Sequence, residues 1–261
     1  MGLASHRTLP LIERGQGKPV VFLHGYPLNH EIWEPQLELL SDGHRVVLLD
    51  LPGYGLAREW PVPDTLAGFA EIVHRTLNQH FSSPVVVVGH SFGGYVALEM
   101  FRNNAGQFRG AVLTDTRSEP DTPEARENRL ATVHRLEDPS QHLDVEATVR
   151  GLVAPRTWES GGPLLETLRR IVQDAPSPTI IASLKAIAGR ADLTPVLPTL
   201  QVPALVLWGE EDTLIPPGQS RAMVARLRAG VGVGIPGAGH LPFLETPAAF
   251  ARAVDSFLGR L

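Results

Sequence analysis

A serine within a five-residue motif is the first feature of this sequence that indicates a specific chemistry. Residues 89–93 read Gly-His-Ser-Phe-Gly, a G-x-S-x-G pattern that follows four valines and precedes an apolar segment. This setting predicts a strand, a tight turn and a helix, with Ser91 at the turn as a nucleophile. The glycines on either side tolerate the strained backbone of such a turn. Without the flanking strand and helix, an ordinary serine in a glycine turn would be the better interpretation.

A serine hydroxyl becomes a nucleophile only when a base takes its proton and a third group orients that base. His240 is the predicted base, because its glycine-rich loop follows the apolar run Val231–Ile235 and can return over the sheet. Asp212 is the preferred acid, since its loop follows the neighbouring run Ala204–Trp208. The acid stays open, and the other candidates are Glu210, Glu211 and Asp115.

The remaining histidines are less well placed to act on Ser91. His24 stands at a strand end, where we expect a structural hydrogen bond, and His90 is expected to point away from the serine. His30 and the histidines in other polar or helical surroundings are expected to be solvated. None of them receives a catalytic role.

Acyl transfer also requires backbone N–H donors for the oxyanion that forms on the substrate carbonyl. Residues 24–27, His-Gly-Tyr-Pro, follow an early strand and can present the N–H of Tyr26, although simple turn formation also explains the glycine and proline. The second predicted donor is the N–H of Phe92, at the start of the helix after the nucleophile. The positive end of that helix's dipole favours negative charge at the same place.

Short apolar runs alternate with segments of helical spacing through much of the chain. The predicted strands are Val20–Leu23, Val46–Leu49, Val85–Val88, Ala111–Leu113, Ala204–Trp208 and Val231–Ile235. Apolar residues at helical spacing, as over 66–77, predict amphipathic helices between them. Alternating strands and helices indicate an α/β fold with a mostly parallel central sheet flanked by helices.

The alternation stops after Asp115, and only helix signals occur until about Pro198. Thr122, Gly162 and Ser177 each precede a proline, which is the arrangement of a helix cap and a first helical residue. Open α/β sheets bind ligands at the carboxyl ends of their strands, so a helical insertion there would cover the site. We therefore predict a core domain of residues 1–115 and 199–261 and a helical lid of residues 116–198, inserted after the sixth strand.

The segments at 24–27, 50–55, 89–94, 209–212 and 237–242 together resemble those of the lid-bearing α/β-hydrolases. More narrowly, they are similar to bacterial esterases and 3-oxoadipate enol-lactonase-like hydrolases. The resemblance covers nearly the whole chain, but its motifs all lie in the predicted core. It implies the α/β-hydrolase fold and a purely structural turn at 50–55. We expect a serine hydrolase that cleaves a carboxylic ester or lactone through an acyl-enzyme on Ser91, with no cofactor and no metal.

Other activities of this fold stay open. A serine at the centre of the motif disfavours reactions through an aspartyl ester, whereas carbon–carbon bond hydrolysis and perhydrolysis are alternatives. A ligand receptor with a retained triad and slow turnover is the alternative from another class. An anionic lactone would require a cation under the lid. The arginines available there are Arg117, Arg129, Arg135 and Arg190.

Composition narrows the range of partners. A net charge of −5 and scattered arginines offer no basic surface for nucleic acid. The absence of cysteine excludes disulfides and thiolate metal sites. A G-x-G-x-x-G match at 232–237 lacks the helix start that a phosphate site needs. No signal peptide or membrane-spanning apolar run is visible, so we expect a cytoplasmic protein acting on a small molecule.

Overall fold

A sheet of seven strands forms the centre of the computed structural model, which describes residues 8–103 and 105–261. The strand order is β1-β3-β2-β4-β5-β6-β7, and every neighbouring pair is parallel except β1 with β3. The strands are β1 (Leu11–Arg14), β2 (Pro19–Leu23), β3 (Arg45–Leu49), β4 (Val85–His90), β5 (Phe108–Thr114), β6 (Ala204–Gly209) and β7 (Gly230–Ile235). Residues 1–7, which the sequence prediction assigns to the core domain, lie outside the described residues.

The valine-rich runs form strands as predicted. Two features differ from expectation: the strand β1 was not predicted, and the number of strands before the insertion is different. β1 carries a half-exposed edge sequence, Leu-Ile-Glu-Arg, with no buried run to mark it. Only this strand precedes β2 in the described chain, so the helical insertion follows the fifth strand. Within the described residues, five strands precede the insertion, compared with the predicted six.

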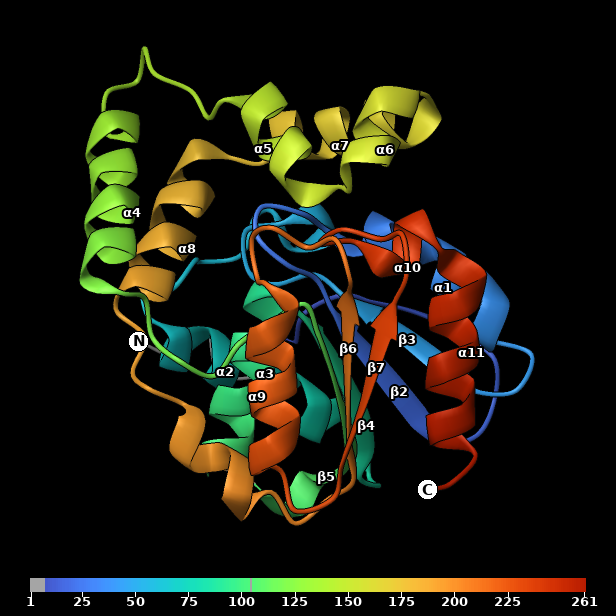
Figure 1. Cartoon of the computed structure of the whole chain (residues 1–261). Helices are drawn as coiled ribbons and strands as arrows, with labels where there is room; N and C mark the ends of the chain where they lie inside the picture. Colours follow the sequence, from blue (N-terminus) through green and yellow to red (C-terminus); the bar gives the residue numbers. More distant parts are fainter. Residues whose placement is uncertain (1–7, 104) are drawn as a thin grey trace.

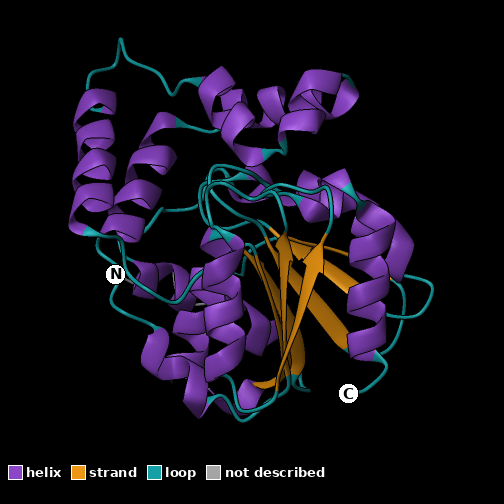
Figure 2. Cartoon of the chain, in the orientation of Figure 1, coloured by secondary structure: helices purple, strands orange, loops and turns teal. Residues whose placement is uncertain are grey.

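Helices cover both faces of the sheet (Figure 1, Figure 2). The α-helices are α1 (Glu34–Leu40), α2 (Leu66–His80), α3 (Phe92–Asn103), α4 (Pro123–Leu136), α5 (Val145–Leu152), α6 (Pro155–Ser160), α7 (Pro163–Asp174), α8 (Ser177–Ala188), α9 (Pro217–Arg226), α10 (Pro242–Glu245) and α11 (Pro247–Leu258). In Figure 1, α2, α3 and α9 lie on one side of the strands, and α1 and α11 lie on the other.

Alternation along the strands divides the core between these two helical layers. Val21 and Leu23 of β2 join the buried cluster that includes α2 and α3. Val20 and Phe22 of the same strand join the cluster that includes α1 and α11. Because both faces are buried, the strands contain continuous apolar runs. Each fully buried side chain of this kind contributes about 1.5–3 kcal/mol relative to exposure.

Helices α4 to α8 lie beyond the end of the sheet toward which the arrowheads of β6 and β7 point (Figure 1). The side chain of Thr122 caps α4 and Gly162 precedes α7, as predicted. Ser177 is the first residue of α8 rather than its cap, because Pro176 already has the extended backbone of a cap residue. The 3₁₀ helix η4 (Thr194–Thr199) returns the chain to the core, where Val196 and Leu197 pack against the α2–α3 layer.

The α-helices of the described chain serve the packing of this layered structure. None of them combines the length and the apolar character that crossing a membrane requires. Ligands of open α/β sheets bind at the carboxyl ends of the strands, so we expect the site between these ends and helices α4 to α8.

Candidate active site

Ser91 occupies a strained turn between β4 and α3. Its φ of 48° lies in the left-handed region, which residues other than glycine rarely adopt. A Cβ at Gly93 would lie 2.5 Å from the carbonyl oxygen of Leu23, so only glycine lets α3 approach β2 this closely. The Ser91 N–H donates to Thr114 O at 3.0 Å, which fixes the turn to β5. The Ser91 hydroxyl has no hydrogen-bond partner within the described chain and faces the cavity that Ser91 lines.

The histidine and acid loops meet next to this turn. His240 Nδ1 and Asp212 Oδ2 are 2.7 Å apart, and both side chains are buried. The other oxygen of Asp212 accepts the N–H groups of Leu214 and Ile215, at 2.8 and 3.0 Å. These three bonds hold the carboxylate in one orientation toward the imidazole. The roles of His240 and Asp212 in catalysis stay predictions.

Glu210 and Glu211, the other candidate acids of this loop, make no hydrogen bond to His240 within the described residues. Glu210 accepts from the indole of Trp208 at 3.0 Å and pairs with Arg221. Glu211 makes no side-chain hydrogen bond within the described residues. Of the acids in this loop, only Asp212 contacts His240.

Asp115, the fourth candidate acid, is buried next to the Asp212–His240 pair. One of its oxygens accepts the Gly209 N–H at 2.8 Å, and the other accepts the Thr114 hydroxyl at 2.7 Å. Burial, reinforced by the negative charge of Asp212, raises the pKa of Asp115 well above its ordinary value. Burial and this neighbouring carboxyl group therefore favour the protonated form of Asp115.

Ligand atoms of Asp115, Asp212 and His240 lie within 4.8 Å of one another, a spacing that would also admit a metal ion. Hydrogen bonds already occupy all four carboxylate oxygens of this group. The contact between His240 and Asp212 is thus accounted for by a hydrogen bond, and the contacts of Asp115 by its bonds to Thr114 and Gly209.

The predicted oxyanion donors lie on two neighbouring segments. Phe92 begins α3, so its N–H has no acceptor within the helix. Neither this N–H nor that of Tyr26 has an acceptor in the part of the chain that the structure describes, and both residues line the same cavity as Ser91. Two unpaired N–H groups beside a serine are the arrangement that an oxyanion requires.

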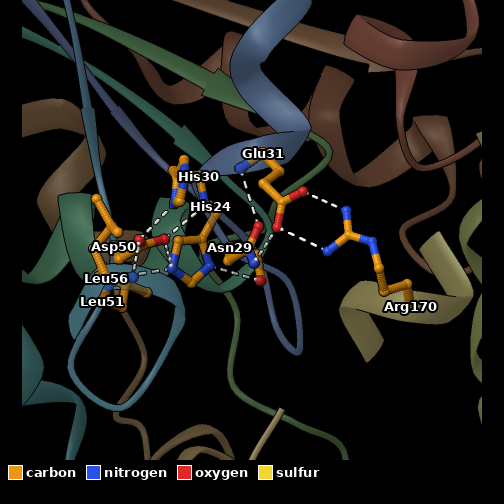
Figure 3. Close-up of polar contacts among 9 residues, drawn as sticks. His24, Asn29, His30, Glu31, Asp50, Leu51, Leu56 and Arg170 are labelled. Atoms are coloured by element: carbon orange, nitrogen blue, oxygen red, sulfur yellow. Dashed lines mark hydrogen bonds and ion pairs between the residues drawn. The ribbon is translucent and has the colours of Figure 1, made fainter. Parts of the chain in front are cut away.

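A buried cluster of His24, His30 and Asp50, here called the Asp50 cluster, holds the loop that carries Tyr26 (Figure 3). Asp50 accepts the backbone N–H and Nδ1–H of His30, each at 2.6 Å, and the Leu56 N–H at 2.7 Å. His24 Nε2 accepts the Leu51 N–H at 2.9 Å, which confirms the expected structural hydrogen bond. The prediction that His30 is solvated is wrong, because its side chain bonds to Asp50 instead. Asp50 is 20 residues away in sequence, so local spacing does not reveal this partner.

Two further residues support the His240 loop and were not predicted to do so. His90 is buried, and its Nε2–H donates to the carbonyl oxygen of His240 at 2.9 Å. Glu245 accepts the Gly239 N–H at 2.7 Å and, through its other oxygen, the Ala154 N–H at 2.9 Å. The short segment that follows His240 in the sequence gives no signal that Glu245 reaches the helical insertion.

A cavity of about 250 Å³ joins these elements. Ser91 and His240 line it from the sheet, and Leu152 and Ile187 line it from the helical insertion. The predicted cations Arg117 and Arg129 also line it, whereas Arg135 and Arg190 do not. The site is therefore an apolar chamber between sheet and insertion, with a serine, a histidine and two guanidinium groups in its wall.

Comparison with known proteins agrees with this architecture. Residues 20–253 match the alpha/beta hydrolase family, and the chain belongs to that family. A pimeloyl-[acyl-carrier protein] methyl ester esterase of Methylococcus capsulatus is 31% identical over 259 residues, 94% of this chain and 96% of the relative. An (E)-2-((N-methylformamido)methylene)succinate hydrolase of Acinetobacter baylyi is 28% identical over 265 residues, 98% of this chain and 96% of the relative.

A solved structure is similar over the same length. The thermophilic esterase from Thermogutta terrifontis, determined with malate bound, is 33% identical with a TM-score of 0.91, covering 97% of this chain and 93% of the esterase. The predicted α/β-hydrolase fold and the family resemblance are thereby confirmed.

Proposed function

We propose that this protein is a serine hydrolase that cleaves a carboxylic ester or lactone through an acyl-enzyme on Ser91. The observation that carries the proposal is the His240–Asp212 hydrogen bond beside a strained, cavity-lining serine. Relatives named as esterases and as a hydrolase support an ester bond as the target. These features together favour hydrolysis over ligand reception, which needs no nucleophile.

In the proposed mechanism, His240 Nε2 takes the proton of Ser91 as Oγ attacks the carbonyl carbon. The Tyr26 and Phe92 N–H groups stabilise the oxyanion, and Asp212 orients the imidazole and stabilises its positive form. His240 then gives the proton to the leaving alcohol. A water molecule, deprotonated by His240, attacks the acyl-enzyme and releases the carboxylic acid, which restores Ser91. We expect a hydrogen bond between Ser91 Oγ and His240 Nε2 to form when substrate binds.

The helical segment 116–198 completes the site as a lid. Leu152 and Ile187 from this segment form part of the cavity wall that faces Ser91. Ionic contacts join it to the core, including Arg170 of α7 with Glu31 (Figure 3). Exclusion of water by such a cover strengthens every electrostatic contact within the cavity.

A labelling experiment tests the nucleophile. A fluorophosphonate probe should modify the wild-type protein at Ser91, and Ser91→Ala should abolish both the labelling and the hydrolysis of p-nitrophenyl esters. Loss of the nucleophile lowers kcat by about a millionfold in serine hydrolases. The exposed Ser256→Ala variant on α11 is the matched control and should keep full activity.

Two results would contradict the proposal. Full esterase activity in Ser91→Ala, with no labelling of the wild type, would remove Ser91 from the mechanism. A single stoichiometric turnover with the product retained would instead favour a receptor that keeps a triad.

A further inference from the structure

An arginine cluster lies next to the proposed nucleophile. Asp121 accepts hydrogen bonds from Arg117 at 2.6 Å, Arg129 at 2.8 Å and Arg190 at 3.0 Å. Its side chain is 1% exposed, and the three arginine side chains are 14%, 24% and 0% exposed respectively. Three guanidinium groups thus share one buried carboxylate, which leaves an excess of positive charge.

Arg190 has three hydrogen-bond acceptors within the protein and does not line the cavity, although its buried Nε has no partner. This guanidinium also donates to the carbonyl oxygens of Ile187 and Glu119, each at 2.9 Å, and lies 4.3 Å from the ring centre of Tyr95. One arginine with these partners is sufficient to neutralise Asp121. The pairing of Asp121 therefore does not explain the other two guanidinium groups.

Arg117 and Arg129 retain free donors. Arg117 makes one side-chain hydrogen bond, through Nη2, and its buried Nε has no partner. Arg129 uses Nε and Nη2 on Asp121, and within the described chain neither arginine has a partner for Nη1. Both side chains line the cavity that contains Ser91 and His240.

The remaining cavity wall supplies no negative charge to match these two cations. None of the described residues that line it is an aspartate or glutamate, and most of its wall is apolar, as at Phe92 and Leu152. Glu119, which is two residues from Arg117, accepts from the Ser118 hydroxyl instead. Two guanidinium groups that share one carboxylate beside a largely apolar cavity carry positive charge that a bound anion would offset.

We propose that Arg117 and Arg129 bind a free carboxylate of the substrate, so that the natural substrates are monoesters of short dicarboxylic acids. The inference rests on the proposed function, since it assigns the ester group to Ser91. Guanidinium groups match carboxylates with two parallel hydrogen bonds, which no other cationic side chain does. The apolar wall between the two ends suits the methylene chain of the diacid.

A pair of esters that differ in one charge tests the assignment. Monomethyl and dimethyl adipate present the same scissile methyl ester, and only the monoester has a free carboxylate. For the wild type, methanol release should give a kcat/KM about ten- to a hundredfold higher for the monoester, the effect of one or two charge-assisted hydrogen bonds. Equal rates on both esters would overturn the inference while leaving the proposed hydrolase intact.

Substitutions of the two arginines test whether they cause the preference for the monoester. Arg117→Gln and Arg129→Gln should each lower kcat/KM for the monoester more than for the diester, and so reduce the monoester preference toward one. Arg135→Gln is the matched control, because it removes the same charge from α4 at an exposed position outside the cavity. Retention of the preference in both cavity variants, or its loss in Arg135→Gln, would also overturn the inference.

A purely structural role for the cluster predicts a different pattern. Glutamine variants that lose activity equally on both esters would show that the arginines only support the fold. Arg117→Lys and Arg129→Lys keep the charge beside Asp121 but not the paired donors, so they should fold and keep an intermediate preference. Failure of Ser91 to label, with no cleavage of either ester, would instead remove the proposed function itself.

Discussion

The contacts of individual residues indicate which carboxyl group orients the imidazole of His240. Asp212 contacts the imidazole directly, whereas Asp115 bonds to Thr114 and Gly209 and has a pKa raised by burial and by the charge of Asp212. Asparagine imitates a protonated aspartate but not an ionised one. Asp115→Asn should therefore keep kcat within about tenfold of the wild type, whereas Asp212→Asn should lower it by about ten-thousandfold, as loss of a triad acid does.

Initial rates with a p-nitrophenyl ester, normalised to the fraction of Ser91 that a fluorophosphonate labels, measure both effects. Glu210→Gln and Glu211→Gln are controls for a general change of charge in the same loop, and both should remain active. A large loss in Asp115→Asn, together with a small loss in Asp212→Asn, would make Asp115 the orienting acid.

At the scale of elements, the Asp50 cluster joins the loop after β2 to the loop after β3. Burial disfavours the charged forms of both His30 and Asp50. Their hydrogen bond outweighs burial and raises the pKa of His30. The same bond, together with the nearby His24, lowers the pKa of Asp50. The histidine contribution is complete below about pH 6.5 and is lost as pH rises through the raised folded value. The aspartate contribution is present above about pH 3.9 and is lost as pH falls through the lowered folded value.

The ion pair should thus stabilise the fold most between these limits. A double-mutant cycle of His30→Gln and Asp50→Asn, followed by urea unfolding, should give a coupling free energy of about 1–3 kcal/mol at about pH 5.5. That coupling should decrease by about pH 9. His24 and the neighbouring carboxylate of Glu31 also face the pair and must be left unchanged.

The pair His44–Asp255 is a suitable control, since its atoms are 2.8 Å apart but Asp255 is 66% exposed. Surface pairs of this kind contribute about 0–1 kcal/mol, so its coupling should be small at every pH. A coupling for His30 and Asp50 that stays constant from acid to alkaline pH would show that their contact does not depend on charge.

Local sequence signals predicted a large part of these elements. The valines before Ser91, the apolar spacing of α2 and the cap at Thr122 each act through neighbours a few residues away. The contacts that support the site join distant segments instead, as between His30 and Asp50 or between Glu245 and Ala154. Their side chains are ordinary polar residues in sequence, and only the fold determines their partners.

At the scale of the whole molecule, Glu245 connects the helical insertion to the loop of His240. Its two oxygens bind Gly239 on one side and, on the other, Ala154 and the Thr157 hydroxyl at 2.6 Å. A Cβ on Gly239 would lie 2.4 Å from the Ala154 backbone nitrogen, so the two segments are also in direct contact. Movement of the insertion is therefore expected to displace the loop that carries His240.

Glu245→Gln tests this coupling, because the amide places a donor against one of the N–H groups that the carboxylate now accepts. We expect a loss of about 1–3 kcal/mol at this junction and about a tenfold decrease in kcat. Amide hydrogen exchange should accelerate at Ala154 and Gly239 together, which a local defect in α6 would not produce. Glu159→Gln, at an exposed position of α6, should change neither exchange nor kcat. Faster exchange at Ala154 alone, with kcat unchanged, would show that the insertion moves independently of His240.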